Sequence, residues 1–401
     1  MSTVRTEDFT RSDGPSREEL VARAVALQPL LREQAAKNEA RRRLTDEVST
    51  ALIEAGLFRL LTPRRLGGYE TGLRTVLEVT EALGEADGST SWLISVGSVA
   101  SWVSGLASAQ AQDDVFGTDP DARIAGGSAP AAARRVEGGL RVSGRWAYSS
   151  GAHNATWASM GALIMDEEGG VVDAVLCFAP ASEVTLEDTW HTVGMRGTGS
   201  NTWVAEDVFV PGHRIISMGA MAEGAWPVPT DEAMYRLPFV PLATVPLVGP
   251  LLGIGRAALA LVIETAPTRG MHHTFFTKQS DSVGVQIQIA EAALKLKTAR
   301  LHAYGIADDL DAAAARGEDS DYSARAEIRA QLGYAAQQVL EAITILVNVH
   351  GAGSFAEASR MQQYWRDANT AARHAGLNAV IGYEVLGKAL LGIEERISPA
   401  I

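Results

Sequence analysis

Glycine and serine are concentrated in three short stretches near the middle of the chain: GGSAP (126–130), YSSGAHNATW (148–157) and GMRGTGSN (194–201). Residues this small let backbone N–H groups come close to a planar polar ligand. Trp157 or Trp203 can offer an aromatic face to the same ligand. Ordinary β-turn chemistry explains any single stretch better, so only their co-occurrence favours a ligand site.

A second set of residues able to do chemistry lies near the C-terminal end, in RDANTAARHAGLN (366–378). Its titratable side chains are Asp367 and His374. A histidine can accept or donate a proton near neutral pH, which suits acid–base catalysis. From sequence position alone, His374 is better explained as a hydrogen-bonded helix histidine.

Several familiar catalytic and nucleotide-binding patterns are missing from the sequence. It contains no GxxxxGK[ST], no HExxH and no GxSxG, and RGTGSN (196–201) precedes a strand pattern, not a helix. His272 and His273 are adjacent and lack further ligands nearby, so they are weak evidence for a metal. We expect no Rossmann pyrophosphate site, no nucleophile elbow and no metal site.

Charge and apolar patterning narrow the class of protein. The 35 basic and 48 acidic residues give a net charge of −13 without a basic run, which argues against nucleic acid or an anionic membrane as partner. The most apolar segment, from Phe239, is interrupted by three prolines and Arg256, which disfavours a membrane span. Cys177 is the only cysteine, which fits a cytoplasmic protein.

The elements that must position these residues change in type along the chain. Apolar residues recur at helical spacing up to about residue 121, alternate in short strands from 122 to 235, and return to helical spacing from 236 to 401. These boundaries predict an N-terminal helical domain, a central β-barrel or sandwich domain and a C-terminal helical bundle, a mostly α form of the α+β class. A hairpin is expected about DEEGG (166–170).

Three details of the helical parts matter for the site. The apolar, small-residue helix that contains Trp92 and Trp102 is either central core or a pocket wall. The segment 308–323, DDLDAAAARGEDSDYS, is expected to be a charged loop, and 360–392 a single last helix. Gly351 is expected to cap the helix before it.

The order of motifs resembles the acyl-CoA dehydrogenase fold, and within it the flavin-dependent monooxygenases typified by the oxygenase component of 4-hydroxyphenylacetate hydroxylase. The resemblance rests on IAGGSAP, VSGRWAYSSGAHNATW, GMRGTGSNTWVAEDVFVP and WRDANTAARH, and it covers nearly the whole chain. Each motif alone is weak, and their co-occurrence in this order is specific. True dehydrogenases of the fold carry a carboxylate base near the last helix, whereas this chain has His374 there.

The resemblance implies roles for individual residues. His374 would manage the proton of a flavin peroxide, and Ser149 or Ser150 would hydrogen-bond the flavin near N5. Other implied cofactor contacts are Tyr148, Trp157, Arg196, Thr198, Arg269, Gly351 and Gly353, of which Arg269 would reach a flavin phosphate, often in a neighbouring subunit. The substrate side would include Trp92, Trp102 and Ser128. Phenol-hydroxylating relatives often carry a histidine in the helix of Trp102, and its absence here puts simple phenols in doubt.

The implied activity is that of the oxygenase component of a two-component monooxygenase. A separate flavin reductase would supply reduced FMN or FAD, with FMN slightly favoured, by free diffusion. Oxygen would form a C4a-hydroperoxide that hydroxylates an aromatic substrate, including polyketide and other natural-product aromatics. A cytoplasmic homotetramer is expected. The alternatives are an N-oxygenase of an amino sugar or amine, a flavin-dependent acyl-CoA dehydrogenase, and a catalytically inactive scaffold of the same fold.

Overall fold

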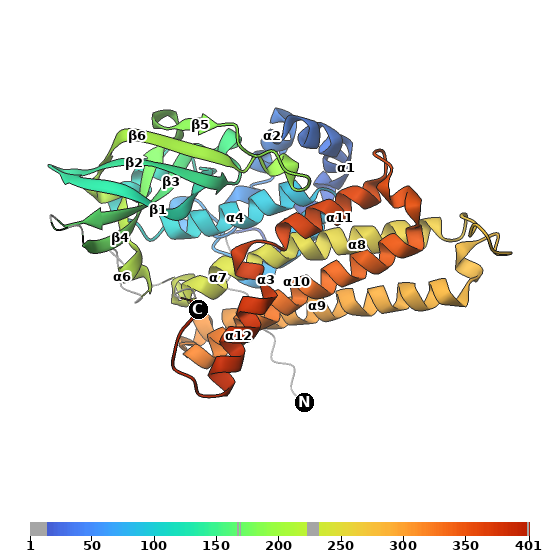
Figure 1. The fold of residues 1–401 in the computed structure, drawn as a ribbon. Helices are drawn as coiled ribbons and strands as arrows, with labels where there is room; N and C mark the ends of the chain where they lie inside the picture. The colour runs from blue at the N-terminus through green and yellow to red at the C-terminus, as the bar shows by residue number, and fades with distance from the viewer. Residues whose placement is uncertain (1–13, 167, 169, 223–231, 399–400) are drawn as a thin grey trace.

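The computed structural model describes residues 14–166, 168, 170–222, 232–398 and 401, with the side chains of residues 128 and 130 left out. A block of helices, a sheet and a second block of helices follow one another along the chain (Figure 1). This order confirms the predicted α+β, mostly α class. The exact domain boundaries stay predictions.

The N-terminal block is built from helices with clear start signals. Ser16 and Glu19 form the predicted capping box of the first helix, and Thr45, Asp87 and Ser108 cap later ones. Its α-helices are α1 (Arg17–Arg41), α2 (Asp46–Glu54), α3 (Leu73–Gly84), α4 (Gly88–Ser104) and α5 (Ala109–Phe116).

The central strands form one seven-stranded sheet in the order β5-β6-β2-β1-β3-β4-β7. Neighbouring strands pair antiparallel except β1 and β3, which are parallel and bring Gly126 beside Ser159. The predicted hairpin about residues 166–170 is confirmed by the pairing of β3 with β4. The strands are β1 (Ile124–Val136), β2 (Gly139–Ser149), β3 (Trp157–Met165), β4 (Val171–Pro180), β5 (Thr185–Glu187), β6 (Asn201–Pro211) and β7 (Ile215–Ser217).

The C-terminal block packs long helices side by side, and α4 lies between them and the sheet (Figure 1). Its α-helices are α7 (Phe239–Thr244), α8 (Val248–Thr265), α9 (Val283–Arg316), α10 (Tyr322–His350), α11 (Arg360–Ala371) and α12 (Ala379–Leu390); α6 (Met218–Ala222) follows the sheet. Gly351 ends α10 with a positive φ of 79°, as predicted.

A buried carboxylate joins the two helical blocks. Glu81 of α3 is 2% exposed and forms ion pairs with Arg256 of α8, at 3.0 Å, and Arg300 of α9, at 3.1 Å. Tyr304 of α9 donates a hydrogen bond to the same carboxylate. Because every partner lies on another helix, this cluster fixes the position of α3 against the bundle.

Two helical segments, Phe239–Thr265 and Tyr322–His350, are long and apolar enough to cross a membrane by length and composition alone. Most of each apolar window is buried inside the protein, 67% and 61% respectively. Core helices of this length have the same composition, so the segments are weak evidence for a membrane protein.

Two sequence predictions about helices are wrong. Residues 308–316 belong to α9, because alanine strongly favours the helical conformation. The helix ends only at Gly317, whose positive φ of 70° is typical of a C-terminal cap. The segment 360–392 is two helices, α11 and α12, separated by a short 3₁₀ turn at Ala375–Leu377. This break decides where His374 lies.

Candidate active site

A cavity of about 650 Å³ lies where the three parts of the chain meet. One wall is α4, a second is the sheet together with the loop before β6, and a third is the end of α11 with the turn that follows it. Residues of these walls include Trp92, Val96, Ala100, Gly126, Tyr148, Ser150, Ser159, Trp190, Met195, Thr198, Ser200, Thr370, Arg373 and His374. Its size and its mixture of aromatic walls with a few polar groups are typical of a small-molecule site.

The break between α11 and α12 presents His374 to this cavity. Asn378 caps α12 through Ile381 N–H, and Arg329 of α10 donates a hydrogen bond to the Ala375 carbonyl at 3.0 Å. A Cβ on Gly376 would lie 2.8 Å from Thr244, so the turn needs glycine to pack this closely. These three contacts hold the backbone on either side of the histidine.

The ring of His374 is fixed in orientation and tautomer. Its Nδ1 accepts a hydrogen bond from Gly376 N–H at 3.1 Å, so the neutral ring carries its proton on Nε2. Trp92 meets the ring edge-on, with the two centroids 5.6 Å apart. Burial by the surrounding walls, and then the charge of Arg329, lower the pKa of His374. The neutral form is therefore favoured at neutral pH.

A chain of hydroxyl groups runs from the cavity into the protein. Ser150 Oγ lies 2.7 Å from Ser200 Oγ, which lies 2.7 Å from Thr198 Oγ1. Thr198 donates to the Met195 carbonyl at 2.7 Å, so Ser200 donates to Thr198 and Ser150 donates to Ser200. In this arrangement Ser150 offers the cavity its lone pairs as a hydrogen-bond acceptor.

The two adjacent serines of the SSG stretch are therefore placed differently. Ser149 is fully buried and donates to the Trp146 carbonyl at 2.9 Å, whereas Ser150 lines the cavity. Tyr148, just before them, has a positive φ of 62°, is 74% exposed and lies at the rim, with its ring edge-on to Trp190 at 6.0 Å. Only Ser150 of the pair can contact a ligand in the cavity.

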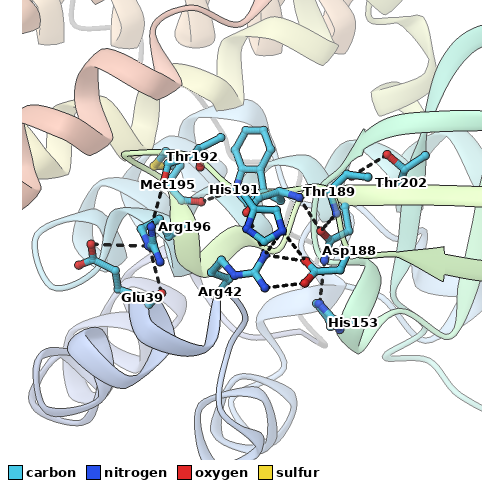
Figure 2. A network of polar contacts seen from close by, with 12 residues as sticks. Glu39, Arg42, His153, Asp188, Thr189, His191, Thr192, Met195, Arg196 and Thr202 are labelled. Atoms are coloured by element: carbon cyan, nitrogen blue, oxygen red, sulfur yellow. Dashed lines mark hydrogen bonds and ion pairs between the residues drawn. The ribbon is translucent and has the colours of Figure 1, made fainter.

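Hydrogen bonds and ion pairs hold the loop before β6 in place, as Figure 2 shows. Arg42 at the end of α1 forms two hydrogen bonds of 2.6 Å with Asp188, and Thr189 pairs with Thr202 at 2.7 Å. Arg196 donates to the backbone carbonyls of Glu39 and Thr192. These contacts anchor the glycine-rich loop to α1 and to β6 while its Thr198 and Met195 line the cavity.

Asp367 of α11 holds the same loop through a hydrogen bond to its backbone. Its buried carboxylate accepts a 2.6 Å hydrogen bond from Met195 N–H, where the backbone has a positive φ of 52°. The pKa of Asp367 is raised to about 7, mainly because the carboxyl is buried and in smaller part because of the nearby charge of Asp87, while the hydrogen bond from Met195 opposes the shift. Asp367 is thus a positioning residue for the cavity wall.

The titration of Asp367 predicts a slope of stability with pH. The folded carboxyl holds its proton up to about pH 7 and the unfolded one loses it near pH 4, so stability falls as pH rises through this window. Asp367→Asn keeps an acceptor for Met195 and should lack this slope, a difference of more than about 1 kcal/mol between pH 5 and pH 8. Denaturant unfolding of both proteins at the two pH values checks this, and parallel slopes would contradict it.

Three further predicted site residues, Trp102, Trp157 and Arg196, lie outside the cavity lining. Trp102 is fully buried and donates to the Met234 carbonyl at 3.1 Å, and Trp157 packs under the Arg214 guanidinium at 5.0 Å. Arg196 lies in the anchored loop, where its guanidinium donates hydrogen bonds to backbone carbonyls. Ser128 lies on β1, but its side chain is outside the described residues.

Arg269, Gly351 and Gly353 come together elsewhere. A Cβ on Gly353 would meet the Arg269 guanidinium at 3.2 Å, and Gly351 begins the same turn after α10. The segment after α8 that carries Arg269 lies at the end of the bundle away from the sheet (Figure 1). These three residues form a group of their own, separate from the cavity.

Several cavity residues have no role in the sequence interpretation: Ser159, Trp190, Ser200, Thr370 and Arg373. Trp190 lies four residues before the first glycine of the glycine-rich stretch 194–201, and Arg373 directly precedes His374, so both are close to the recognised motifs. Their side-chain directions depend on the anchored loop and on the helix break, which the sequence pattern did not reveal. Among the described residues, no three His, Cys, Asp or Glu side chains group as metal ligands.

Comparison with known proteins gives one consistent family. Residues 19–115 match the model of the acyl-CoA dehydrogenase N-terminal domain, and residues 246–379 match that of the C-terminal domain. The chain is 34% identical over 374 residues to the flavin-dependent monooxygenase oxygenase subunit HsaA of Rhodococcus jostii, covering 92% of this chain and 98% of that protein. It is 29% identical to the oxygenase component of the FADH2-dependent resorcinol hydroxylase of a Rhizobium species, covering 94% and 95%.

Solved structures agree with the sequence relatives. XiaF from a Streptomyces species, in complex with FADH2 and glycerol, superimposes with a TM-score of 0.91 at 37% identity, covering 96% of this chain and 98% of that one. The 3-HSA hydroxylase from Rhodococcus sp. RHA1 gives a TM-score of 0.89 at 33% identity, covering 95% and 99%.

Proposed function

This chain belongs to the oxygenase subunits of flavin-dependent monooxygenases with the acyl-CoA dehydrogenase fold, and we propose that its substrate is an aromatic compound larger than a simple phenol. The observation that carries the proposal is the helix break that presents His374 to a cavity with aromatic walls. Within the described residues, no carboxylate lines that cavity. A dehydrogenation that begins by removing an α-proton would lack its base there.

The residues present fit a flavin. The cavity volume of about 650 Å³ suits a planar ring system together with a small substrate. Gly126 and Ser159, side by side on adjacent strands in the cavity wall, would form the floor under a bound ring. The strands approach closely there, since a Cβ on Gly126 would lie 1.8 Å from the Ser159 carbonyl oxygen. Ser150 and Thr198 supply hydroxyls at the edge of this floor. Ser150 would hold the flavin near N5, and Trp190 and Tyr148 would cover the ring.

Reduced flavin, when bound, would supply the two electrons that activate molecular oxygen, one atom of which goes to the substrate while the other leaves as water. His374 then holds or donates a proton at Nε2, because Nδ1 is occupied by Gly376 N–H. Trp92 and the apolar residues of α4 exclude water from the reacting groups. Trp92 also lies where an aromatic substrate can stack, whereas Trp102 only supports α4 from within the core.

The choice of flavin and the timing of oxygen chemistry can be tested without a substrate. The sequence interpretation slightly favours FMN, but two relatives carry FADH2 in their names, so reduced FAD is our first choice. Anaerobic protein with either reduced flavin is mixed with oxygen and followed by stopped-flow absorbance. A transient spectrum that outlasts the reaction of free flavin supports an oxygenase, and reoxidation at the rate of free flavin contradicts it.

The hydroxyl chain predicts a preference for reduced flavin. Reduced flavin carries a hydrogen on N5 and oxidised flavin does not, so an acceptor at Ser150 matches only the reduced form. Ser200→Ala removes the acceptor of the Ser150 hydroxyl, which is then free to donate instead. We expect the ratio of dissociation constants for oxidised and reduced flavin to fall about fivefold, consistent with one hydrogen bond. Anaerobic titrations measure the ratio, and an unchanged ratio would contradict the assigned direction.

We propose a homotetramer in which a second subunit completes the flavin site. Arg269, Gly351 and Gly353 would serve a neighbour's flavin phosphate, because they are remote from the cavity of their own chain. Exposed apolar side chains support such contacts. Val283, Ile287, Leu294 and Leu301 are each more than 60% exposed and follow one face of α9, and Phe275 and Phe355 are exposed near Arg269. A monomer in sedimentation at working concentration would contradict the proposal.

A partner protein must supply the reduced flavin that this chain uses. The names of the relatives describe oxygenase subunits or components, which imply a reductase that supplies reduced flavin. We propose that reduced flavin reaches this chain by free diffusion in the cytoplasm. Burial raises the pKa of the single thiol, Cys177, to about 12, so it stays protonated and takes no part in this chemistry.

A further inference from the structure

Arg373 is a charged side chain in the cavity wall that makes no side-chain contact holding the fold together among the described residues. It lines the cavity directly before His374 and is exposed. Its backbone N–H bonds to the Thr370 carbonyl, but its guanidinium forms no hydrogen bond or ion pair with any residue that the structure describes. A guanidinium carries five donors and stays charged, so an unpaired one facing a cavity is suited to a ligand.

Three other arginines near the cavity, unlike Arg373, have partners within the fold. Arg366, in the helix that precedes Arg373, pairs with Glu39 at 2.7 Å, and Arg42 pairs with Asp188 at 2.6 Å. The Arg196 guanidinium donates hydrogen bonds to the backbone carbonyls of Glu39 and Thr192. Among the described residues that line the cavity, Arg373 is the one with a permanent charge, and none carries a carboxylate. The cavity is thus locally cationic in a chain with a net charge of −13.

We infer that Arg373 recognises a negative charge on a planar ring system bound in the cavity. The inference rests on the proposed function and adds a ligand class to it. Two sources offer this chemistry: an aromatic acid as substrate, or the reduced flavin itself, which is anionic when N1 has lost its proton. Arg373 and the Nε2–H of His374 are donors on one turn, Trp92 meets the His374 ring edge-on, and Trp190 lines the same cavity. A ring that packs on these aromatic side chains would present its anionic edge to the turn.

The test compares matched charged and neutral ligands. Indole-3-acetate and indole-3-acetamide differ in charge but hardly in shape, and reduced and oxidised FAD are compared anaerobically. Dissociation constants are measured for wild-type protein, Arg373→Met and Arg373→Lys, at low and high salt. Arg135→Met removes the same charge from the exposed β1–β2 hairpin and serves as control.

We expect Arg373→Met to raise the dissociation constant of the charged ligand about tenfold, equivalent to about 1.4 kcal/mol. The dissociation constant of the neutral counterpart should stay unchanged. The salt dependence of the charged ligand's binding should disappear with the lost affinity, and Arg373→Lys should restore part of both. A loss confined to indole-3-acetate assigns Arg373 to the substrate, and a loss confined to reduced FAD assigns it to the cofactor.

Equal affinities of wild-type protein and Arg373→Met for all four ligands would overturn the inference. The proposed function would survive that result if the wild-type protein still shows the transient stopped-flow spectrum. A wild-type protein that binds no reduced flavin would instead overturn the proposed function, and the inference with it.

Discussion

Replacing His374 by alanine is expected to lower product formation by about 100-fold or more while reduced flavin still binds. General acid–base groups contribute at least this much when they act on the reacting atoms. The neutral ring, with its proton on Nε2, lies in the cavity wall beside Trp92, and no other histidine lines that cavity among the described residues. The measurement is product formed per flavin oxidised, once a substrate is known.

Two further variants separate catalysis from structure. His374 also caps the turn that follows it, and His374→Asn keeps a side-chain acceptor for Gly376 N–H without the imidazole. His272→Ala changes an exposed loop histidine and should have wild-type activity. If His374→Asn forms product as well as the wild type, His374 has only a capping role.

The same reasoning predicts a pH profile. Burial lowers the pKa of His374, so product formation should be constant at neutral pH and fall only at a pH below the ordinary value for histidine. Protonation would place a hydrogen on Nδ1, which would then face Gly376 N–H. The acidic fall should be missing from the residual activity of His374→Asn.

Gly126→Ala should abolish flavin binding and destabilise the protein by about 3 kcal/mol, the upper end for overpacking. The new Cβ would lie 1.8 Å from the Ser159 carbonyl oxygen and 2.5 Å from its hydroxyl, so β1 and β3 would have to move apart at the floor of the cavity. For a chain of this length the thermal midpoint should fall by a few degrees.

Gly127 provides a matched control one residue away. A Cβ there would lie 3.5 Å from its nearest neighbour, the Ala147 carbonyl oxygen, which is an ordinary contact. Gly127→Ala should therefore keep both flavin binding and the thermal midpoint. Equal behaviour of the two variants would show that the floor tolerates a wider spacing than we infer.

Local patterns in the sequence predicted the fold well. Capping signals such as Ser16 with Glu19, and Gly351 after α10, are read from a few neighbouring residues, and the structure confirms both. The error at 308–316 came from treating charge as a loop signal. Three aspartates in that stretch remain compatible with a helix because alanines surround them and the helix is exposed on one side.

The site was less predictable because it depends on contacts between distant parts of the chain. Gly376 and Asn378 are ordinary signals of a helix end, yet the apolar pattern runs on past them, and this hid the break. The direction of Ser150 depends on Ser200, fifty residues away. The use of Asp367 to hold Met195 joins residues separated by more than 170 positions. The catalytic and cofactor roles of these residues stay predictions.

The cavity exists only while the two helical blocks and the sheet are docked on one another, because each supplies a wall. A ligand in this cavity contacts all three regions at once, so it binds only the folded protein in which they are docked. Such binding raises the melting temperature by an amount that grows with ligand concentration over its dissociation constant. Melting temperatures measured with libraries of aromatic compounds, with and without flavin, can therefore identify candidate substrates without an assay of turnover.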